Sequence, residues 1–455
     1  MERFETNEME KTRKYYGDQT KMAQANFNIS KRINEGEMIR SLAKIKQACA
    51  MANLHAGTLT TSKANAIVYA CDAIIRGHYH DQFVVDPIQG GAGTSANMNA
   101  NEVIANIAQE YLDRQKVSQR VHPNDDVNLA QSTNDVYPSA GKLTIMVLME
   151  GLVEQLRLLE DDLGLKKEEF RGVYKVGRTQ LQDAVVMSLG QSFQAYRTMI
   201  SRDIRRINQA TGAMKTLNLG ATAIGSSINT SPEYLKSVVG FLSMVTGFEL
   251  IQADDLFDAT SNIDSFGDVS SSLKNLAVNL NKMANDLRLL ASGPRTGFNE
   301  ITLPYKQNGS SIMPGKVNPV ILEVVNQVAF LVMGNDLTVS LACQNGQLEL
   351  NAFEPVAFSC LFESITTLTQ AIRTLRVNCI QGIKANRKAC LAYLDNSIWQ
   401  VTPLAQGIGY DLAASLAKEA LHEDEQVKKL ALNKGLLSSD EYDALIDYQR
   451  LSGMR

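Results

Sequence analysis

The sequence predicts an all-α protein built around a bundle of long helices. Apolar residues recur at steps of three and four over segments much longer than an ordinary helix, with charged residues between them. Prolines are scarce, with 10 in 455 residues, and no polar–apolar alternation runs long enough to support a sheet core. We therefore expect long amphipathic helices that pack side by side.

Five segments show this helical period. In the first, from Lys142 to Phe170, the apolar positions are Met146, Met149, Val153, Leu156, Leu159 and Leu163. The others cover residues 184–217, 266–290, 321–342 and 357–384. Several helices of about 25 residues cannot each bury an apolar stripe within one small monomer, so we expect other subunits to complete the bundle.

The length of the chain exceeds what one hydrophobic core usually serves. Polar loops near Val136 and Asp395 divide the pattern into three parts. We expect an N-terminal, mostly helical domain over residues 1–135, a central long-helix domain over 136–394, and a small C-terminal helical domain over 395–455.

The composition is that of a soluble protein, with 44% hydrophobic and 21% charged residues. A net charge of −4 gives no reason to expect nucleic acid or an anionic membrane as a partner. The opening residues, MERFETNEMEKTRKYYGDQT, lack the apolar core of a signal peptide, and the six cysteines form no CxxC pair. We predict a cytoplasmic protein with free thiols.

Polar, glycine-bearing loops separate the helical segments, at residues 89–102, 122–140, 176–184, 218–230 and 308–320. Hydroxyls, amides and one lysine predominate in them. Such a set suits a small, oxygen-rich anion that is held by many hydrogen bonds. The candidate residues are Thr94, Ser132, Thr133, Asn134, Thr179, Gln180, Ser310, Ser311, Lys316 and Asn318.

Several familiar sites do not fit these loops. Five residues separate Gly309 from Gly315 where a phosphate loop needs four, and Val317 stands where that loop binds magnesium. The stretch GGAGTS lacks the third glycine of a dinucleotide-binding turn. The five histidines show no zinc spacing, and no GxSxG elbow offers a nucleophilic serine.

Proton abstraction is the chemistry that the loop NGSSIMPGKVNPV, residues 308–320, suits best. A serine pair in a glycine-flanked loop beside a lysine can supply a serine base when loop closure excludes water. Lys316 and nearby amides would then stabilise charge on a carboxylate next to the C–H bond that loses its proton. The residues alone leave open that this loop is a structural connection.

Long motifs in these loops resemble the fumarase/aspartase superfamily of lyases. The stretch GSSIMPGKVNP, residues 309–319, is similar to the signature of that superfamily. GTSANMNANEV, HPNDDVN and QSTNDVYP, which begin at Gly93, His122 and Gln131, resemble its other segments in the same order. The resemblance implies a three-domain all-α fold, a homotetrameric helix bundle, and active sites formed by loops of three chains.

Within the superfamily the sequence resembles the aspartases. Fumarases carry a histidine at the position of Gln180, which pairs with the glutamate matching Glu323, and glutamine has no titratable proton to pass. They also commonly carry lysine at the position of Glu354. The resemblance implies reversible conversion of L-aspartate to fumarate and ammonia. A fumarate hydratase, a lyase acting on a modified succinate or aspartate, and a silent structural homotetramer remain as alternatives.

The resemblance also implies roles for the candidate residues. Ser310 would take the Cβ proton, and Lys316, Asn318 and Thr179 would hold a substrate carboxylate. Asn134 and Gln180 would contact the amino group. The β-carboxylate would be held by a set of hydroxyls, namely Thr94, Ser132, Thr133 and Ser311.

The family needs no organic cofactor, and the sequence does not reveal whether a divalent cation activates this member. Three positions depart from the aspartase pattern: Val186 replaces a common proline, and Ser226–Ser227 replace a more usual Thr-Gly. We expect a structural role for His122.

Overall fold

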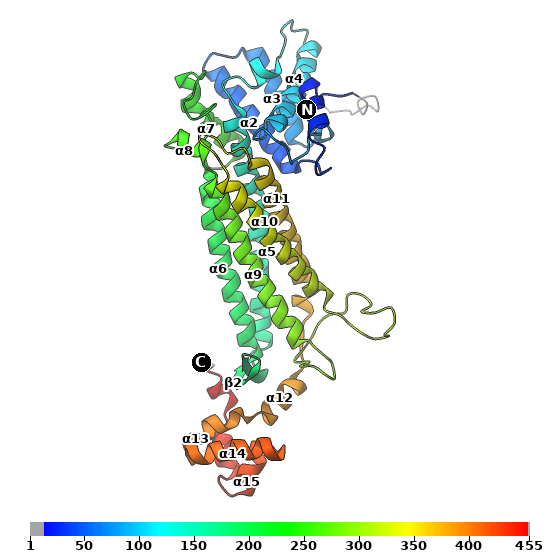
Figure 1. Ribbon diagram of the computed structural model, residues 1–455, viewed down its shortest axis with the longest axis vertical. Coiled ribbons are helices and arrows are strands. Elements are labelled where there is room, and N and C mark those ends of the chain that lie inside the picture. The colour runs from blue at the N-terminus through cyan, green and yellow to red at the C-terminus, as the bar shows by residue number, and fades with distance from the viewer. Residues whose placement is uncertain (1–12, 454–455) are drawn as a thin grey trace. The chain divides into compact units, whose positions relative to one another are not determined.

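The computed structural model describes residues 13–453. Helices make up most of this range, and its strands are short and pair only two at a time (Figure 1). The all-α prediction is therefore confirmed.

The N-terminal helices are α1 (Asp18–Asn26), α2 (Gly36–His55), α3 (Thr61–Ile75) and α4 (Thr94–Arg114). A short 3₁₀ turn, η2 (His80–Gln82), and a π turn, η3 (Pro123–Val127), lie in the connections. The N-terminal end of α4 follows Gly93, whose φ of 86° is left-handed. A Cβ at that position would lie 2.3 Å from the Tyr137 ring, so only glycine fits.

Five long helices form the bundle segments in Figure 1: α5 (Thr133–Glu169), α6 (Leu189–Gly212), α9 (Asp264–Leu290), α10 (Val320–Gln344) and α11 (Glu354–Asn378). Each corresponds to one predicted segment. Several boundaries differ from the prediction. Residues 184–188 belong to a strand, and residues 213–217 to a 3₁₀ turn and a short strand, rather than to α6. Helix α5 begins nine residues before Lys142, and α11 ends at Asn378 rather than at residue 384.

The early start of α5 places Pro138 inside the helix. Proline has no N–H, so the carbonyl of Asn134, four residues earlier, has no backbone donor within the helix. The side-chain amide of Asn218 donates to that carbonyl at 2.9 Å instead. A residue 84 positions away thus compensates the missing bond, and no local pattern could have indicated this.

The remaining helices of the middle region are α7 (Pro232–Thr246) and α8 (Leu256–Ser261), with 3₁₀ turns η4 (Ala213–Lys215) and η5 (Ile380–Gly382). Strands β1 (Tyr174–Thr179) and β2 (Gln182–Ser188) form an antiparallel hairpin whose register shifts between Val176 and Arg178. Strands β3 (Thr216–Leu217) and β4 (Ile251–Gln252) pair in parallel, and β5 (Ile301–Thr302) and β6 (Lys384–Ala385) pair antiparallel.

The C-terminal helices are α12 (Arg387–Asn396), α13 (Val401–Ile408), α14 (Tyr410–Glu423), α15 (Val427–Asn433), α16 (Ser439–Leu445) and α17 (Tyr448–Leu451), with the 3₁₀ turn η6 (Ile398–Gln400). They enclose a core around Trp399 and Tyr442, to which the hairpin contributes Val176 and Val186. Val186 pairs with Val176 and is 3% exposed, so this departure from the aspartase pattern is a packed core residue.

The chain divides into two compact units. Unit 1 contains the residues up to Val153, Arg205–Asn275 and Phe330–Leu368, and unit 2 contains Glu154–Ile204, Leu276–Ala329 and the residues from Thr369 onward. All five long helices contribute a segment to each unit. The division predicted from the sequence, into residues 1–135, 136–394 and 395–455, cuts the chain into consecutive parts, whereas each unit combines separate stretches. The predicted division therefore stays a prediction.

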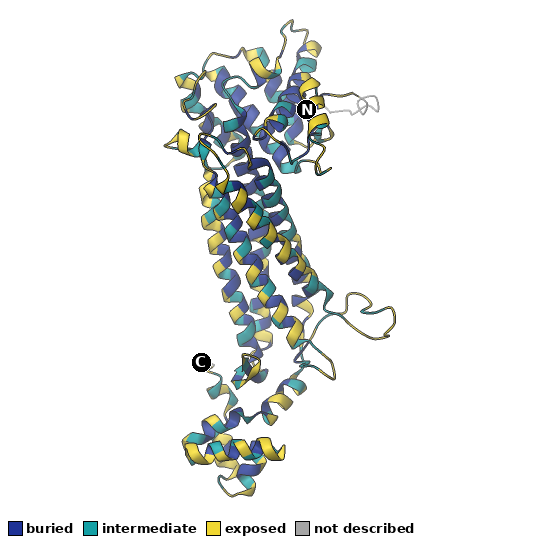
Figure 2. Cartoon of the chain, in the orientation of Figure 1, coloured by how far each residue is buried: buried dark blue, intermediate teal, exposed yellow. Residues whose placement is uncertain are grey.

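One helix in the described range, α10, is long and apolar enough to cross a membrane by length and composition alone. Only 39% of its most apolar window is buried. Phe330, Leu337 and Leu341 recur at steps of seven and four and are 59%, 63% and 48% exposed. Figure 2 shows exposed residues along the bundle helices. An apolar stripe of this kind requires a cover.

Candidate active site

The ten predicted residues fall into two sets. The first set is Thr94, Ser132, Thr133 and Asn134, all in unit 1, and the second set is Thr179, Gln180, Ser310, Ser311, Lys316 and Asn318, all in unit 2.

The first set lies at the N-terminal ends of two helices. Thr94 is the first residue of α4, and Thr133 is the first residue of α5. Gly93 packs against the ring of Tyr137, so the start of α4 lies against the first turns of α5. The N-terminal end of a helix carries a partial positive charge, which favours a carboxylate.

Asp135 organises the start of α5. Its carboxylate, which is fully buried, accepts a hydrogen bond from the backbone N–H of Ser132 at 2.9 Å. It also accepts from the N–H groups of Gly220 at 3.0 Å and Thr222 at 3.1 Å. Burial raises the pKa of Asp135 to about 6, against the opposing effect of these N–H donors and of the Lys46 charge. The STND turn is therefore fixed to the loop that follows β3.

Thr133 is supported by a buried amide network. Asn97, one turn into α4, donates to Thr133 Oγ1 at 3.1 Å and to Asn128 Oδ1 at 3.2 Å. The same Asn128 oxygen accepts from the Nδ2 of Asn101 at 3.3 Å. Lys46 Nζ donates to it as well, at 2.8 Å. We call Lys46, Asn97, Asn101 and Asn128 the amide network.

Lys46 is fully buried on α2, and its second acceptor is Gln131 Oε1 at 2.9 Å. Burial lowers the pKa of Lys46 to about 8, while the neighbouring Cys49 and Asp135 act in the opposite direction. Sequence analysis missed this lysine. Its signal was a lone cation on an apolar helix face, four residues after Leu42 and three before Cys49.

The other members of the first set have defined contacts. Asn134 Nδ2 donates to the Ala223 carbonyl at 2.7 Å, and Ser132 Oγ accepts from the Asn134 N–H at 3.3 Å. Thr94 is exposed, and its hydroxyl donates to the Gly91 carbonyl at 2.7 Å. The departures Ser226 and Ser227 lie in the same loop as Ala223, where Ser227 has a φ of 53°.

Thr179 and Gln180 of the second set lie at the tip of the β1–β2 hairpin, and both are exposed. Gln180 and Leu181 have φ values of 55° and 63°, and Thr179 pairs with Gln182 across them. Two successive left-handed residues make the tight turn that matches strand twist. The local backbone thus presents Thr179 and Gln180 to solvent.

The loop from residue 303 to 319 holds the rest of the second set. Ser310 Oγ accepts hydrogen bonds from the backbone N–H groups of Ile312 and Met313, each at 3.1 Å. N–H donors aimed at a hydroxyl oxygen favour its deprotonated form. Serine therefore stands in a setting suited to a base.

Bonds within this loop also bring Ser310 near Asn318. Asn318 Nδ2 donates to the Gly309 carbonyl at 2.5 Å, and the Gly309 N–H donates to the Lys316 carbonyl at 3.1 Å. A Cβ on Gly309 would lie 2.2 Å from that carbonyl oxygen, so glycine is required. Ser311 and Lys316 are exposed.

Glu354 lies in unit 1, at the position where fumarases commonly carry lysine. It is 1% exposed, and burial raises its pKa well above the usual range, while the charge of Lys142 acts in the opposite direction. Lys142 Nζ donates to the Thr216 carbonyl at 2.8 Å. A buried lysine here would face a second cation instead of a carboxyl group.

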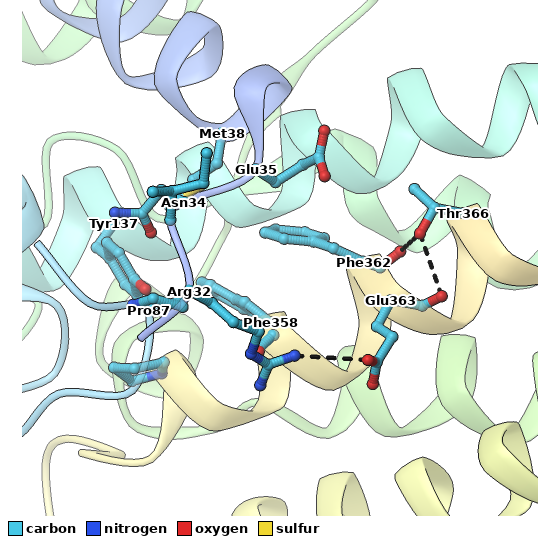
Figure 3. A pocket seen from close by; sticks show the side chains of 13 residues that line it. Arg32, Asn34, Glu35, Met38, Pro87, Tyr137, Phe358, Phe362, Glu363 and Thr366 are labelled. Atoms are coloured by element: carbon cyan, nitrogen blue, oxygen red, sulfur yellow. Dashed lines mark hydrogen bonds and ion pairs between the residues drawn. The ribbon is translucent and has the colours of Figure 1, made fainter. Parts of the chain in front are cut away.

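A cavity of about 220 Å³ in unit 1 contains none of the ten predicted residues. Its lining includes Arg32 and Glu363, which form an ion pair of 3.5 Å, together with the rings of Tyr137, Phe358 and Phe362. Figure 3 shows these side chains, with the ion pair as a dashed line. Across residues 13–453, no group of three or more His, Cys, Asp or Glu side chains could hold a metal ion. His122 caps the π turn by accepting from the Asp125 N–H, a structural contact.

The sequence matches the lyase family over residues 7–334 and the fumarase C C-terminus family over residues 401–453. An aspartate ammonia-lyase of Helicobacter pylori is 51% identical over 432 residues, covering 94% of this chain and 92% of that protein. One from Bacillus subtilis is 47% identical over 435 residues, covering 95% and 91%.

Two solved structures have the same fold. A fumarate lyase:delta crystallin from Brucella melitensis bound to cobalt superposes with a TM-score of 0.93 at 45% identity, covering 96% of both chains. A class II fumarase from Schistosoma mansoni has a TM-score of 0.92 at 33% identity, covering 97% of this chain and 96% of that one. These likenesses define a lyase.

The agreement of family, relatives and fold confirms the resemblance seen in the sequence. The chain belongs to the fumarase/aspartase superfamily, in its aspartate ammonia-lyase family.

Proposed function

We propose that this protein is an aspartate ammonia-lyase, which converts L-aspartate reversibly to fumarate and ammonia. The observation that carries the proposal is identity of 46–51% to aspartate ammonia-lyases over nearly the whole chain. The protein is thus a carbon–nitrogen lyase of amino-acid metabolism. Gln180, in place of the histidine of fumarases, favours this reaction over hydration.

The reaction removes a proton from Cβ, next to the β-carboxylate. The electron pair of that C–H bond moves into the carboxylate and gives a dianionic, enediolate-like intermediate. Its collapse forms the double bond and breaks the C–N bond, whose electron pair leaves with neutral ammonia. Catalysis therefore requires a base for the Cβ proton and donors that stabilise the intermediate more than the substrate.

Ser310 is the base in this mechanism. The two N–H groups that point at its Oγ support this role, because they stabilise the oxygen once it has lost its proton. Ile312 and Met313 beside it are 83% and 50% exposed. An exposed apolar loop tip suits a loop that closes over substrate and excludes water.

The binding roles follow the two sets. Lys316, Asn318 and Thr179 hold one carboxylate, with Lys316 supplying the charge. Asn134 contacts the amino group, with Gln180 nearby. The β-carboxylate, where charge develops, is held by Thr94, Ser132, Thr133 and Ser311. The two helix N-termini of the first set and the ammonium of Lys46 behind it support an anion at that place.

A homotetramer whose active sites combine loops of several chains completes this proposal. The exposed stripe of Phe330, Leu337 and Leu341 on α10 supports association, since water is a poor partner for it. The proposal keeps the three-domain division at 135 and 394, a cytoplasmic location, and a reaction that needs no organic cofactor. A divalent cation could still act as an activator.

The oligomer has its own test. Leu337→Glu places a charge in the stripe and should lower the molar mass measured by light scattering to that of smaller species. Leu421→Glu, at a residue of similar exposure (67% against 63%) on α14, is the matched control and should stay tetrameric. A Leu337→Glu protein that keeps the mass of the wild type would contradict the stripe as an interface.

Shared sites are tested by mixing two inactive variants. Thr133→Val damages the first set, and Ser310→Ala damages the second set. Tetramers that contain both variants would have some sites in which both sets are intact. Activity in the mixture, absent from each variant alone, is the expected result. A mixture that forms hybrid tetramers without activity would mean that each chain supplies a complete site.

The activity itself is tested by ultraviolet absorbance of fumarate, with L-aspartate and L-malate offered separately. Fumarate from aspartate alone is the expected outcome. Fumarate from malate alone would make the protein a hydratase, and no product from either would direct the search to substituted aspartates and succinates.

A further inference from the structure

A buried cluster of charge lies in unit 2, beside the hairpin tip that carries Thr179 and Gln180. The Glu300 carboxylate, which is 0% exposed, faces two cations of strand β1. Arg178 Nη1 lies 2.7 Å from Oε1, and Lys175 Nζ lies 3.1 Å from Oε2. The side chains of Arg178 and Lys175 are only 11% and 5% exposed.

Stability alone does not explain this cluster. Three buried charges lose their hydration, and well-packed apolar residues at such places are often as stable or more so. Lys175 Nζ donates its hydrogen bond to the Val176 carbonyl at 2.8 Å, so Glu300 Oε2 has an ion-pair partner but accepts no hydrogen bond within the described residues. What an ion cluster does provide is a fixed geometry between the segments that it joins.

On one side the cluster fixes the hairpin tip. Arg178 directly precedes Thr179 and Gln180, follows the register shift of β1, and pairs with Glu300. Its guanidinium also lies 4.2 Å from the ring centroid of Phe298 and 5.5 Å from that of Tyr393. These three contacts hold the Arg178 side chain, whose backbone continues directly into the turn.

On the other side the cluster fixes the stem of the Ser310 loop. The Glu300 N–H donates to the Leu290 carbonyl at the end of α9, and its own carbonyl accepts from the Asn386 N–H, both at 2.9 Å. Strand β5 follows immediately, and the loop begins at residue 303. Glu300 thus joins the two segments. Its backbone leads into the stem of the loop, and its side chain holds the hairpin.

We propose that Glu300 is a positioning residue that couples the hairpin tip, with Thr179 and Gln180, to the stem of the loop that carries Ser310. The inference rests on the proposed function, which makes both segments part of the substrate site. Glu300 touches no substrate. It sets where the loop starts relative to the hairpin, so that closure brings Ser310, Lys316 and Asn318 to a fixed place.

The test compares Glu300→Gln with Asp162→Asn. Asp162 forms another buried ion pair of unit 2, with Arg376 at 2.8 Å and side chains 11% and 10% exposed, but it joins α5 to α11 rather than the two site segments. Misplacement of about 1 Å can cost about 100-fold in rate, so kcat/KM of Glu300→Gln should fall about 100-fold. Asp162→Asn should change kcat/KM by less than about threefold, since its site is independent.

A second readout does not depend on activity. Amide hydrogen exchange should rise in Glu300→Gln at residues 176–183 and at 301–309 together, and in Asp162→Asn at neither. Equal kcat/KM losses in the two variants, or faster exchange at the hairpin alone, would overturn the coupling. If Glu300→Gln does not fold, Arg178→Lys decides in its place, with the same paired rise in exchange and a loss of about tenfold.

The two proposals fail in different ways. A wild-type protein without activity on aspartate would refute the proposed function, whereas the exchange experiment would still decide the coupling.

Discussion

The two sets of site residues are built in opposite ways. The first set is held by buried groups. Asp135 accepts a hydrogen bond from the Ser132 N–H and so fixes the start of α5, and Asn97 of the amide network donates to Thr133. The second set lies on an exposed hairpin tip and on a loop in which Ser310 and Asn318 form hydrogen bonds to the loop's own backbone. Under the proposed mechanism, the contrast teaches that a rigid anion pocket and a closing base make different demands on the fold.

Rigidity suits the first set because an oxyanion is stabilised best by donors that need not reorganise when charge develops. Mobility suits the second set because substrate must enter before water is excluded. In our proposal, Glu300 fixes the position of the loop's stem and leaves its tip able to move, so that the loop can close and still bring Ser310 to the same place.

Removing the proposed base, Ser310 of the second set, should have the largest effect on activity. Ser310→Ala should lower kcat by about 1,000-fold, which is within the range for general bases, and leave aspartate binding nearly intact. Steady-state kinetics measures kcat, and calorimetry measures the dissociation constant for aspartate. Turnover close to that of the wild type would assign the base elsewhere.

The buried amide network behind the first set, unlike the Ser310 loop, should make stability depend on alkaline pH. The pKa of Lys46 is about 8 in the folded protein and 10.5 is its ordinary value, so between these pH values the unfolded chain binds more protons. Stability contributed at Lys46 therefore rises as pH increases from 8 to 10.5. Relative to Lys46→Met, the wild type should gain about 3 kcal/mol across this window.

Denaturant unfolding of both proteins at pH 7.5 and 10.5 measures this difference, with other groups cancelling between them. A difference that stays constant with pH would mean that Lys46 keeps its ordinary pKa.

The smallest expected effect is a rise in KM, which distinguishes a residue that supports the site from one that supports only the fold. Asn97 and Asn99 are both 1% exposed on α4, but Asn97 bonds Thr133 and Asn128, whereas Asn99 bonds Gln82 and Val84. Alanine at either position should cost about 1–3 kcal/mol of stability. Only Asn97→Ala should raise KM, by about tenfold, because it frees Thr133. Equal KM values in the two variants would remove the amide network from the site.

Much of this protein could be predicted from its sequence. The period of apolar residues located all five long helices, because helix packing repeats at local spacing. The order of hydroxyl, amide and lysine residues in the loops indicated an anion site and a serine base. The motifs then identified the superfamily, which the fold confirmed. Each of these signals lies within about a dozen neighbouring residues.

Only the tertiary structure decided the features that depend on distant segments. Asn218 completes the helix that Pro138 interrupts, Lys46 of α2 enters the network behind Thr133, and Glu300 joins β1 to the stem of the Ser310 loop. A buried polar group takes its partner from whatever segment the fold brings within about 3 Å, and sequence spacing does not encode that partner. The sequence by itself therefore determined the superfamily and the residues proposed for the chemistry, and the packing of distant segments decided how those residues are held in place.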